Sequence, residues 1–309
     1  MAWAQTAGPA RTHAQVSRAA AWNVAEFAGR VYCGAGDLAL AAQWIMWMNI
    51  VDDRVETLSE PEIAAALAPI TNVLAQDDPA AGRGAGPFAE SFADLWQRTR
   101  TGMPDEWRSR VAGIWTRCAD SMGWEAANRR AGRAPLLDDY IANRATAGAT
   151  YLALILTEGL GTACLPAELY YAGPLSALRG LAADHICWAN DLLSLEREEQ
   201  RGDVHNLVLV LERTYDHDRP TALAEATRMT NERMYAIRLL ADRIRDYEDA
   251  VGLPDDHRRR LDRSVDDLLA WVAGSLQFHT LSTRHVDHRS GPENPFSAAY
   301  PEGETDPFR

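Results

Sequence analysis

Apolar residues recur at helical spacing along almost the whole 309-residue chain, and no stretch alternates as a half-buried strand would. Breakers such as Gly252-Leu253-Pro254 separate the periodic segments by short connections. This pattern predicts an all-α protein built as a helical bundle. We expect helices at 11–29, 36–56, 60–76, 88–101, 105–130, 137–160, 166–171, 176–200, 203–216, 219–251 and 255–284.

Composition favours one folded domain. At 47% hydrophobic residues the chain can bury a sizeable core, and no linker is long enough to mark a second one. The stretch 78–87 predicts a flexible surface loop. After about residue 287 the sequence becomes rich in Pro and Gly, so we expect a helical domain over 1–286 and a disordered tail over 287–309.

The formal net charge of −13 argues against a nucleic-acid partner and against an anionic membrane surface. No run of 18 or more apolar residues and no basic-then-apolar leader is present. The four cysteines are scattered, with no pair at metal-ligand spacing. We therefore expect a soluble cytoplasmic protein without membrane insertion.

Two polar stripes could hold a divalent cation. Asn190, Ser194 and Glu198 recur every four residues and share one helix face, which gives an all-oxygen ligand set. Asp52 and Glu56 are also four apart, with Asp53 beside them, at the end of a strongly apolar helix. Either stripe alone could equally be a solvated helix surface.

Two further segments carry cations in apolar surroundings. Arg144 lies in a largely apolar helical run, and Gly148 follows it where a glycine weakens a helix. Arg284 and His285 end an aromatic-rich C-terminal segment. Taken singly, each has an ordinary explanation in packing or in helix-dipole stabilisation.

Together these segments resemble, in order and spacing, the bacterial class I terpene synthases (terpene cyclases), over roughly residues 20–286. Asp52-Asp53-x-x-Glu56 is similar to the aspartate-rich motif, and Asn190-Asp191-x-x-Ser194-x-x-Arg197-Glu198 is similar to the second metal motif. Softer similarities are Trp124-Glu125 and Gly202-Asp203-Val204-His205-Asn206. Two departures are Ala147, where the family often has Asp, and His285, where it has Tyr.

The resemblance implies a single-domain class I terpenoid synthase bundle with a central active-site cavity. It implies three Mg²⁺ ions, for which Mn²⁺ could substitute, a prenyl diphosphate substrate and a homodimer. It assigns diphosphate sensing to Arg144 and the triggering carbonyl to Gly148. The implied metal ligands are Asp52, Asp53, Glu56, Asn190, Ser194 and Glu198, and the implied diphosphate-binding residues are Arg144, Asn190, Arg197, Arg284 and His285.

Ideal helical geometry yields candidates for an apolar cavity wall that would shelter a carbocation. The candidates are Ile45, Met48 and, at the edge, Trp44 on one helix, Ile186 and Cys187 on another, and Tyr151, Trp271 and Phe278. Trp47 and Trp188 point away from the metal motifs, and we expect them to pack the bundle.

The leading hypothesis is a Mg²⁺-dependent carbon–oxygen lyase that cyclises farnesyl diphosphate to a sesquiterpene and releases diphosphate. Geranylgeranyl diphosphate, with a diterpene product, is the main alternative substrate. Chain elongation on the same fold is a second hypothesis, against which the Asn-Ser-Glu stripe argues. A third, from another class, is a non-catalytic helical binding protein.

Overall fold

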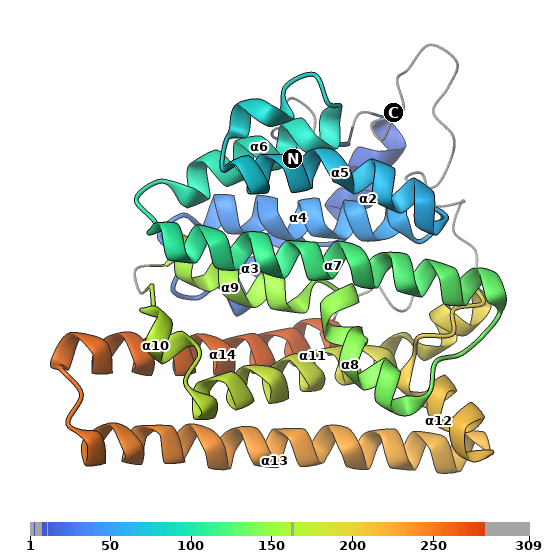
Figure 1. Cartoon of the computed structure of the whole chain (residues 1–309). Coiled ribbons are helices and arrows are strands. Elements are labelled where there is room, and N and C mark those ends of the chain that lie inside the picture. The colour runs from blue at the N-terminus through green and yellow to red at the C-terminus, as the bar shows by residue number, and fades with distance from the viewer. Residues whose placement is uncertain (1–2, 4–7, 11, 162–163, 282–309) are drawn as a thin grey trace.

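The computed structural model describes residue 3 and residues 8–10, 12–161 and 164–281, and this part of the chain contains helices but no strands (Figure 1). The all-α prediction is confirmed. The elements are α2 (His13–Ala21), α3 (Val24–Val31), α4 (Leu38–Val55), α5 (Glu60–Gln76), the 3₁₀ turn η1 (Pro79–Gly82), α6 (Pro87–Arg100), α7 (Asp105–Ala131), α8 (Leu137–Ala147), α9 (Thr150–Leu160), α10 (Ala167–Tyr170), α11 (Gly173–Gln200), α12 (Leu207–Tyr215), α13 (Arg219–Val251) and α14 (Asp255–Leu281). The expected tail at 287–309 lies outside the described residues.

Two expected helices are each divided in the structure. The segment 11–29 breaks between α2 and α3, where Asn23 adopts a left-handed backbone with φ 50°. The segment 137–160 breaks between α8 and α9, where Gly148 ends one helix and Ala149, at φ 53°, precedes the next. Helical periodicity continues through both breaks, so the pattern alone does not reveal them.

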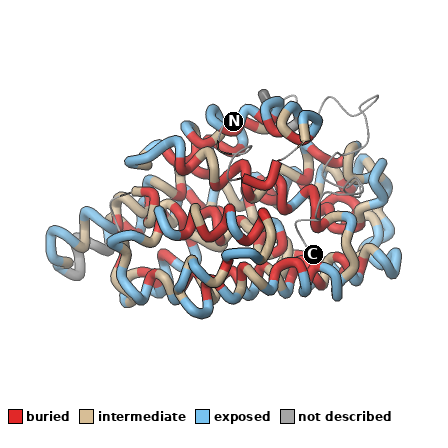
Figure 2. Tube along the Cα trace, turned by 90° about the horizontal axis from the view of Figure 1, so that it is seen from above, coloured by how far each residue is buried: buried red, intermediate tan, exposed pale blue. Residues whose placement is uncertain are grey.

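Helix α4 lies in the upper half of the molecule in Figure 1 and contacts α3, α6 and α9. Beyond its exposed first turn, buried residues lie on several faces of α4, as expected for a helix with neighbours on more than one side. The longest helix, α13, packs along α11, and α14 returns beside α11 and α3. Buried residues accordingly concentrate on the inner faces of the helices (Figure 2). No helix in the described chain is long and apolar enough to cross a membrane.

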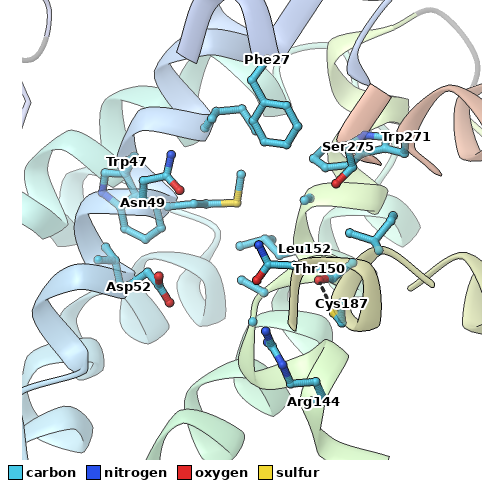
Figure 3. Close-up of a pocket in the computed structure, with 18 of the residues that line it drawn as sticks. Phe27, Trp47, Asn49, Asp52, Arg144, Thr150, Leu152, Cys187, Trp271 and Ser275 are labelled. Atoms are coloured by element: carbon cyan, nitrogen blue, oxygen red, sulfur yellow. Dashed lines mark hydrogen bonds between the residues drawn. The ribbon is translucent and has the colours of Figure 1, made fainter. Parts of the chain in front are cut away.

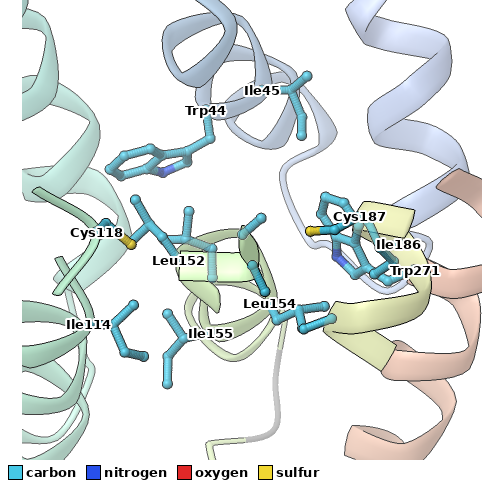
Figure 4. Packing of buried hydrophobic residues seen from close by; sticks show 14 of the residues in the cluster. Trp44, Ile45, Ile114, Cys118, Leu152, Leu154, Ile155, Ile186, Cys187 and Trp271 are labelled. Atoms are coloured by element: carbon cyan, nitrogen blue, oxygen red, sulfur yellow. The ribbon is translucent and has the colours of Figure 1, made fainter. Parts of the chain in front are cut away.

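Large aromatic side chains fill the core. Trp44, Trp47, Trp115 and Phe92 form a cluster with ring centroids 5.2–6.0 Å apart. Edge-to-face and tilted contacts of this kind stabilise a fold beyond their buried area. Figure 4 shows how Leu152 and its neighbours on α9 extend this packing between α4, α7 and α11.

A glycine permits close approach of α14 to α3. A Cβ atom at Gly274 would lie 2.6 Å from the carbonyl oxygen of Arg30, which belongs to the backbone and cannot rotate away. This close contact sets the position of α14 relative to α3.

Gly274→Ala should therefore lower the free energy of unfolding by about 1–3 kcal/mol, because the two helices must separate. Gly180→Ala is the matched control, since Gly180 is helical and has no atom within 4 Å of the added Cβ. That variant should gain about 0.5–1 kcal/mol. Urea unfolding followed by circular dichroism measures both, and equal stabilities would contradict the close-approach argument.

Candidate active site

An apolar cavity of about 170 Å³ lies between α3, α4, α7, α9, α11 and α14. Figure 3 shows Phe27 and Trp271 at one end and Asp52 and Arg144 at the other. Its lining includes the predicted Ile45, Met48, Ile186, Cys187 and Trp271. The cavity is therefore apolar along most of its length and polar at one end.

Four expectations about this wall are wrong. Trp47 lines the cavity instead of only packing the bundle, whereas Trp44 does not line it. The indole N–H of Trp44 donates to the Thr99 hydroxyl at 2.8 Å, which holds the ring against α6. Phe278 stacks on Phe27 behind the wall, with centroids 4.5 Å apart, and Tyr151 is half-buried outside the lining. Trp188 packs as predicted, beneath the guanidinium of Arg233.

A polar chamber adjoins the apolar cavity. Both carry a common set of lining residues, so this set forms the boundary between them. The shared residues are Asp52, Met122, Arg144, Gly148, Asn190 and Arg197. Glu56, Glu198 and Ala147, the residue where the family often has Asp, also line the chamber. The two acidic motifs, distant in sequence, thus face one space.

The carboxylates of Asp52, Asp53 and Glu56 have oxygens within 4.8 Å of one another, at the C-terminal end of α4. Burial and the neighbouring Asp52 raise the pKa of Glu56 to about 8, although Arg201 pairs with it at 2.8 Å. Asp53 is 2% exposed and lies behind the chamber wall. The three carboxyl groups of this cluster thus carry more potential negative charge than the paired Arg201 can balance.

The second motif lies on α11. Asn190 and Glu198 line the chamber, whereas Ser194 is buried beneath them. The Ser194 hydroxyl lies 2.7 Å from both the Asn190 carbonyl oxygen and a Glu198 carboxylate oxygen. Burial, and secondly the charge of Asp191, raise the pKa of Glu198. Only Asn190 and Glu198 of this stripe therefore reach the chamber, and the role of all three residues as metal ligands stays a prediction.

Arg144 is held by the fully buried Asp191. Its Nε and Nη2 donate to Oδ1 of Asp191 at 3.0 and 2.8 Å. The other oxygen of Asp191 accepts from the Tyr140 hydroxyl and, at 2.8 Å, from the Leu207 N–H. These bonds leave Nη1 of Arg144 without a hydrogen-bond partner among the described residues, beside the chamber.

Gly148 lies against this free nitrogen. A Cβ at Gly148 would stand 2.7 Å from Nη1 of Arg144, so a larger residue would displace the guanidinium. The end of α8 at this point also leaves carbonyl groups without intrahelical partners. Gly148 lies at the boundary of cavity and chamber, and its role as the triggering carbonyl stays a prediction.

These residues fit a divalent cation and a polyphosphate. The donors are oxygens, the ligand type of hard cations, and burial together with the neighbouring Asp52 raises the pKa of Glu56, so a bound cation would stabilise its charged form. Nε of Arg197 is buried and has no partner among the described residues, although Arg197 lines both spaces. Arg284 and His285 lie outside the described residues.

Asn206 is a site residue whose role the sequence did not reveal. It is fully buried at the start of α12, and its amide nitrogen donates to the Asp191 carbonyl at 2.7 Å and to Glu198 at 2.8 Å. Its amide oxygen caps α12 by accepting from the Val208 N–H. The one sequence signal was the weak similarity over 202–206.

A second missed group extends the chamber. Glu125, Asp203 and His205 line it, and Asp203 accepts from the ring and backbone nitrogens of His205. Burial raises the pKa of Glu125 to about 7. Burial also opposes the charge on Asp203, but the bonds from His205 outweigh it and lower the pKa. The two weakly similar segments, 124–125 and 202–206, thus meet in space.

Fold and site together define a helical bundle whose cavity ends in an acidic, arginine-lined mouth. A family model described as "Terpene synthase family 2, C-terminal metal binding" matches residues 43–236. The chain is 31% identical over 259 residues to (−)-delta-cadinene synthase of Streptomyces clavuligerus, across 82% of this chain and 78% of that protein. It is 30% identical over 292 residues to (−)-beta-caryophyllene synthase of Saccharothrix espanaensis, across 92% and 82%.

A crystal structure of linalool/nerolidol synthase from Streptomyces clavuligerus, in complex with 2-fluorogeranyl diphosphate, has the same fold. The TM-score is 0.82 at 23% identity, covering 90% of this chain and 95% of that one. The chain belongs to the bacterial class I terpene synthase family, the family model that it matches is described as metal-binding, and the Asp52, Asp53 and Glu56 cluster could hold a metal ion.

Asn206→Ala should weaken divalent-cation binding about 10- to 100-fold, because Glu198 loses the donor that orients it. Asp218→Ala is the matched control, since Asp218 caps α13 through the Thr221 N–H. Both variants lose a helix cap, but only the first loses a bond to Glu198. The readout is the Mg²⁺ concentration that gives half of the rise in melting temperature with diphosphate, and equal values would contradict this role.

Glu56→Gln should flatten the pH dependence of stability in metal-free protein. The folded pKa of about 8 exceeds the ordinary 4.5, so between these values the folded state keeps a proton that the unfolded state has lost. The free energy of unfolding therefore falls as pH rises through this window. Urea unfolding in EDTA should show that the free energy of unfolding decreases less between pH 5.5 and pH 8 in the variant than in the wild type. Part of the decrease should remain, because Glu125 also has a raised pKa. Exposed Glu60→Gln is the control, and a fall as steep as in the wild type would contradict the assignment.

Proposed function

We propose that this protein is a Mg²⁺-dependent terpene cyclase that ionises farnesyl diphosphate and cyclises the resulting carbocation. The observation that carries the proposal is the shared chamber. It brings Asp52, Glu56, Asn190 and Glu198 to the mouth of an apolar cavity, with Arg144 at the boundary. A charged diphosphate and an apolar chain need these two environments side by side.

The chain's own cations hold the leaving group in this proposal. Nη1 of Arg144 and Nε of Arg197 are donors without a hydrogen-bond partner among the described residues, and both arginines line the boundary. Guanidinium groups suit phosphate oxygens. Because Asp191 fixes Arg144 in place, little reorganisation is needed as negative charge develops. Bound Mg²⁺, held by the carboxylates of α4 and the oxygens of α11, would supply further positive charge to the departing diphosphate.

The apolar cavity then governs the carbocation. Phe27, Trp47, Trp115 and Trp271 line it and offer aromatic rings to a cation. Such contacts contribute about 2 kcal/mol or more when water is excluded. A relative that the chain covers over 82% of its length carries the words "(2E,6E)-farnesyl diphosphate cyclizing" in its name, which supports the fifteen-carbon substrate.

Incubation with Mg²⁺ and each linear prenyl diphosphate, followed by analysis of hexane extracts, tests the substrate. We expect cyclic fifteen-carbon products from farnesyl diphosphate. Twenty-carbon products alone would favour geranylgeranyl diphosphate, and products that require isopentenyl diphosphate would favour chain elongation. If no substrate gives a product, and Mg²⁺ with diphosphate does not raise the melting temperature, the result would favour the hypothesis of a non-catalytic helical binding protein.

Asp52→Ala and Asn190→Ala should each lower turnover by at least about 10²–10³, because each removes a group that stabilises developing charge. Circular dichroism should stay unchanged, since Asp52 is exposed and Asn190 half-buried. Asp120→Ala on the exposed face of α7 is the matched control and should keep full turnover. Wild-type turnover in either site variant would contradict the assignment.

A further inference from the structure

An ion pair joins the ends of the two helices that carry the acidic motifs. Glu56 is the C-cap residue of α4, and Arg201 is the C-cap residue of α11. Nη1 of Arg201 donates to Oε2 of Glu56 at 2.8 Å. Glu56 lines the polar chamber, but Arg201 is not among the described residues that line the chamber or the apolar cavity. Arg201 therefore acts on the site through Glu56, from outside the chamber.

The pair of Arg201 with Glu56 is exposed enough to exchange its partners. The side chains of Arg201 and Glu56 are 30% and 29% exposed. By contrast, Asp191 in its pair with Arg144 is 0% exposed, and removing one partner from such a buried pair leaves an uncompensated charge. A pair in contact with water contributes little to stability, because water screens both charges and solvates them after separation. A divalent cation can therefore replace Arg201 at Glu56.

The same carboxylate belongs to the cluster that could hold a cation. Oxygens of Asp52, Asp53 and Glu56 lie within 4.8 Å of one another, and carboxylate oxygens are ligands of hard divalent cations. A cation that binds Glu56 either displaces Arg201 or lies beside its guanidinium. Displacement costs the ion pair, and coexistence costs the repulsion between two positive charges. In both cases Arg201 weakens the binding of the cation.

We propose that Arg201 competes with the divalent cation for Glu56 and so raises the cation concentration that the site requires. This inference rests on the proposed function and adds a control on metal loading to it. Arg197, four residues earlier on α11, lies 3.4 Å from Glu198 of the second motif, but it lines both spaces and can contact a bound diphosphate. Arg201 is outside the lining, so its effect on the cation is competition without binding of the diphosphate.

Arg201→Gln tests the competition by the sign of its effect. The readout is the Mg²⁺ concentration that gives half of the rise in melting temperature with inorganic diphosphate. We expect this concentration to fall about two- to fivefold, the range that a part-exposed ion pair allows. Damage to the fold, or loss of a supporting contact, would raise the concentration or leave it unchanged. A fall therefore distinguishes competition from a structural role.

Arg201→Lys is the conservative variant and should keep the wild-type concentration. It retains the positive charge, and its amine can replace the nitrogen of Arg201 that donates to Glu56. Arg219→Gln is the matched control, since Arg219 pairs with Glu199 and Glu212, which are not among the described residues that line the chamber. This variant should leave the Mg²⁺ concentration unchanged.

In a Glu56→Gln background, Arg201→Gln should no longer lower the concentration, because the carboxylate for which the two cations compete is gone. A wild-type or higher concentration in the Arg201→Gln variant would overturn the inference and leave the proposed cyclase intact. An equal fall in the Arg201→Lys variant would also overturn it, because charge would not be the cause. If Mg²⁺ and diphosphate do not raise the wild-type melting temperature and no prenyl diphosphate gives a product, the proposed function fails together with this inference.

Discussion

The buried ion pair between Arg144 and Asp191 joins the fold to the site. Asp191 is fully buried and receives donors from α8 and from the start of α12, so three helices meet at one carboxylate. Burial and the adjacent Asp191 raise the pKa of the Tyr140 hydroxyl, which therefore remains a donor. Breaking a buried pair by removing one partner typically costs about 3–5 kcal/mol. The pair thus fixes the guanidinium of Arg144 at the cavity boundary.

Burial of the acids that line the polar chamber raises their pKa values. Glu56, Glu125 and Glu198 are the acids affected, and burial is the largest cause in each case. The arginines of the chamber offset this only in part. A space that concentrates carboxylates while excluding water either retains protons or admits cations. Under the proposed function, divalent cations would relieve the repulsion between the carboxylates, and the cations and arginines together would bind the diphosphate.

Local patterns allowed much of this molecule to be predicted from its sequence. Each metal motif lies on a single helix, where spacing alone places Asn190 beside Ser194 and Asp52 beside Glu56. The residues that line the cavity depend instead on which neighbouring helix packs against each face of a given helix. Since buried residues lie on several faces of α4, ideal geometry could not show that Trp47 faces the cavity while a bond to Thr99 turns Trp44 away.

The break between α8 and α9 carries a conformational cost that the cavity explains. Ala149 adopts φ 53° and ψ 20°, a left-handed conformation that costs a non-glycine residue about 1–3 kcal/mol. A continuous helix would avoid this cost but would bond its carbonyls internally. The break instead brings the C-terminal end of α8, which is partially negative, to Gly148 and Ala149 in the cavity lining. Polar backbone groups therefore lie in the apolar cavity lining without a charged side chain. Under the proposed function, the carbocation would form beside them.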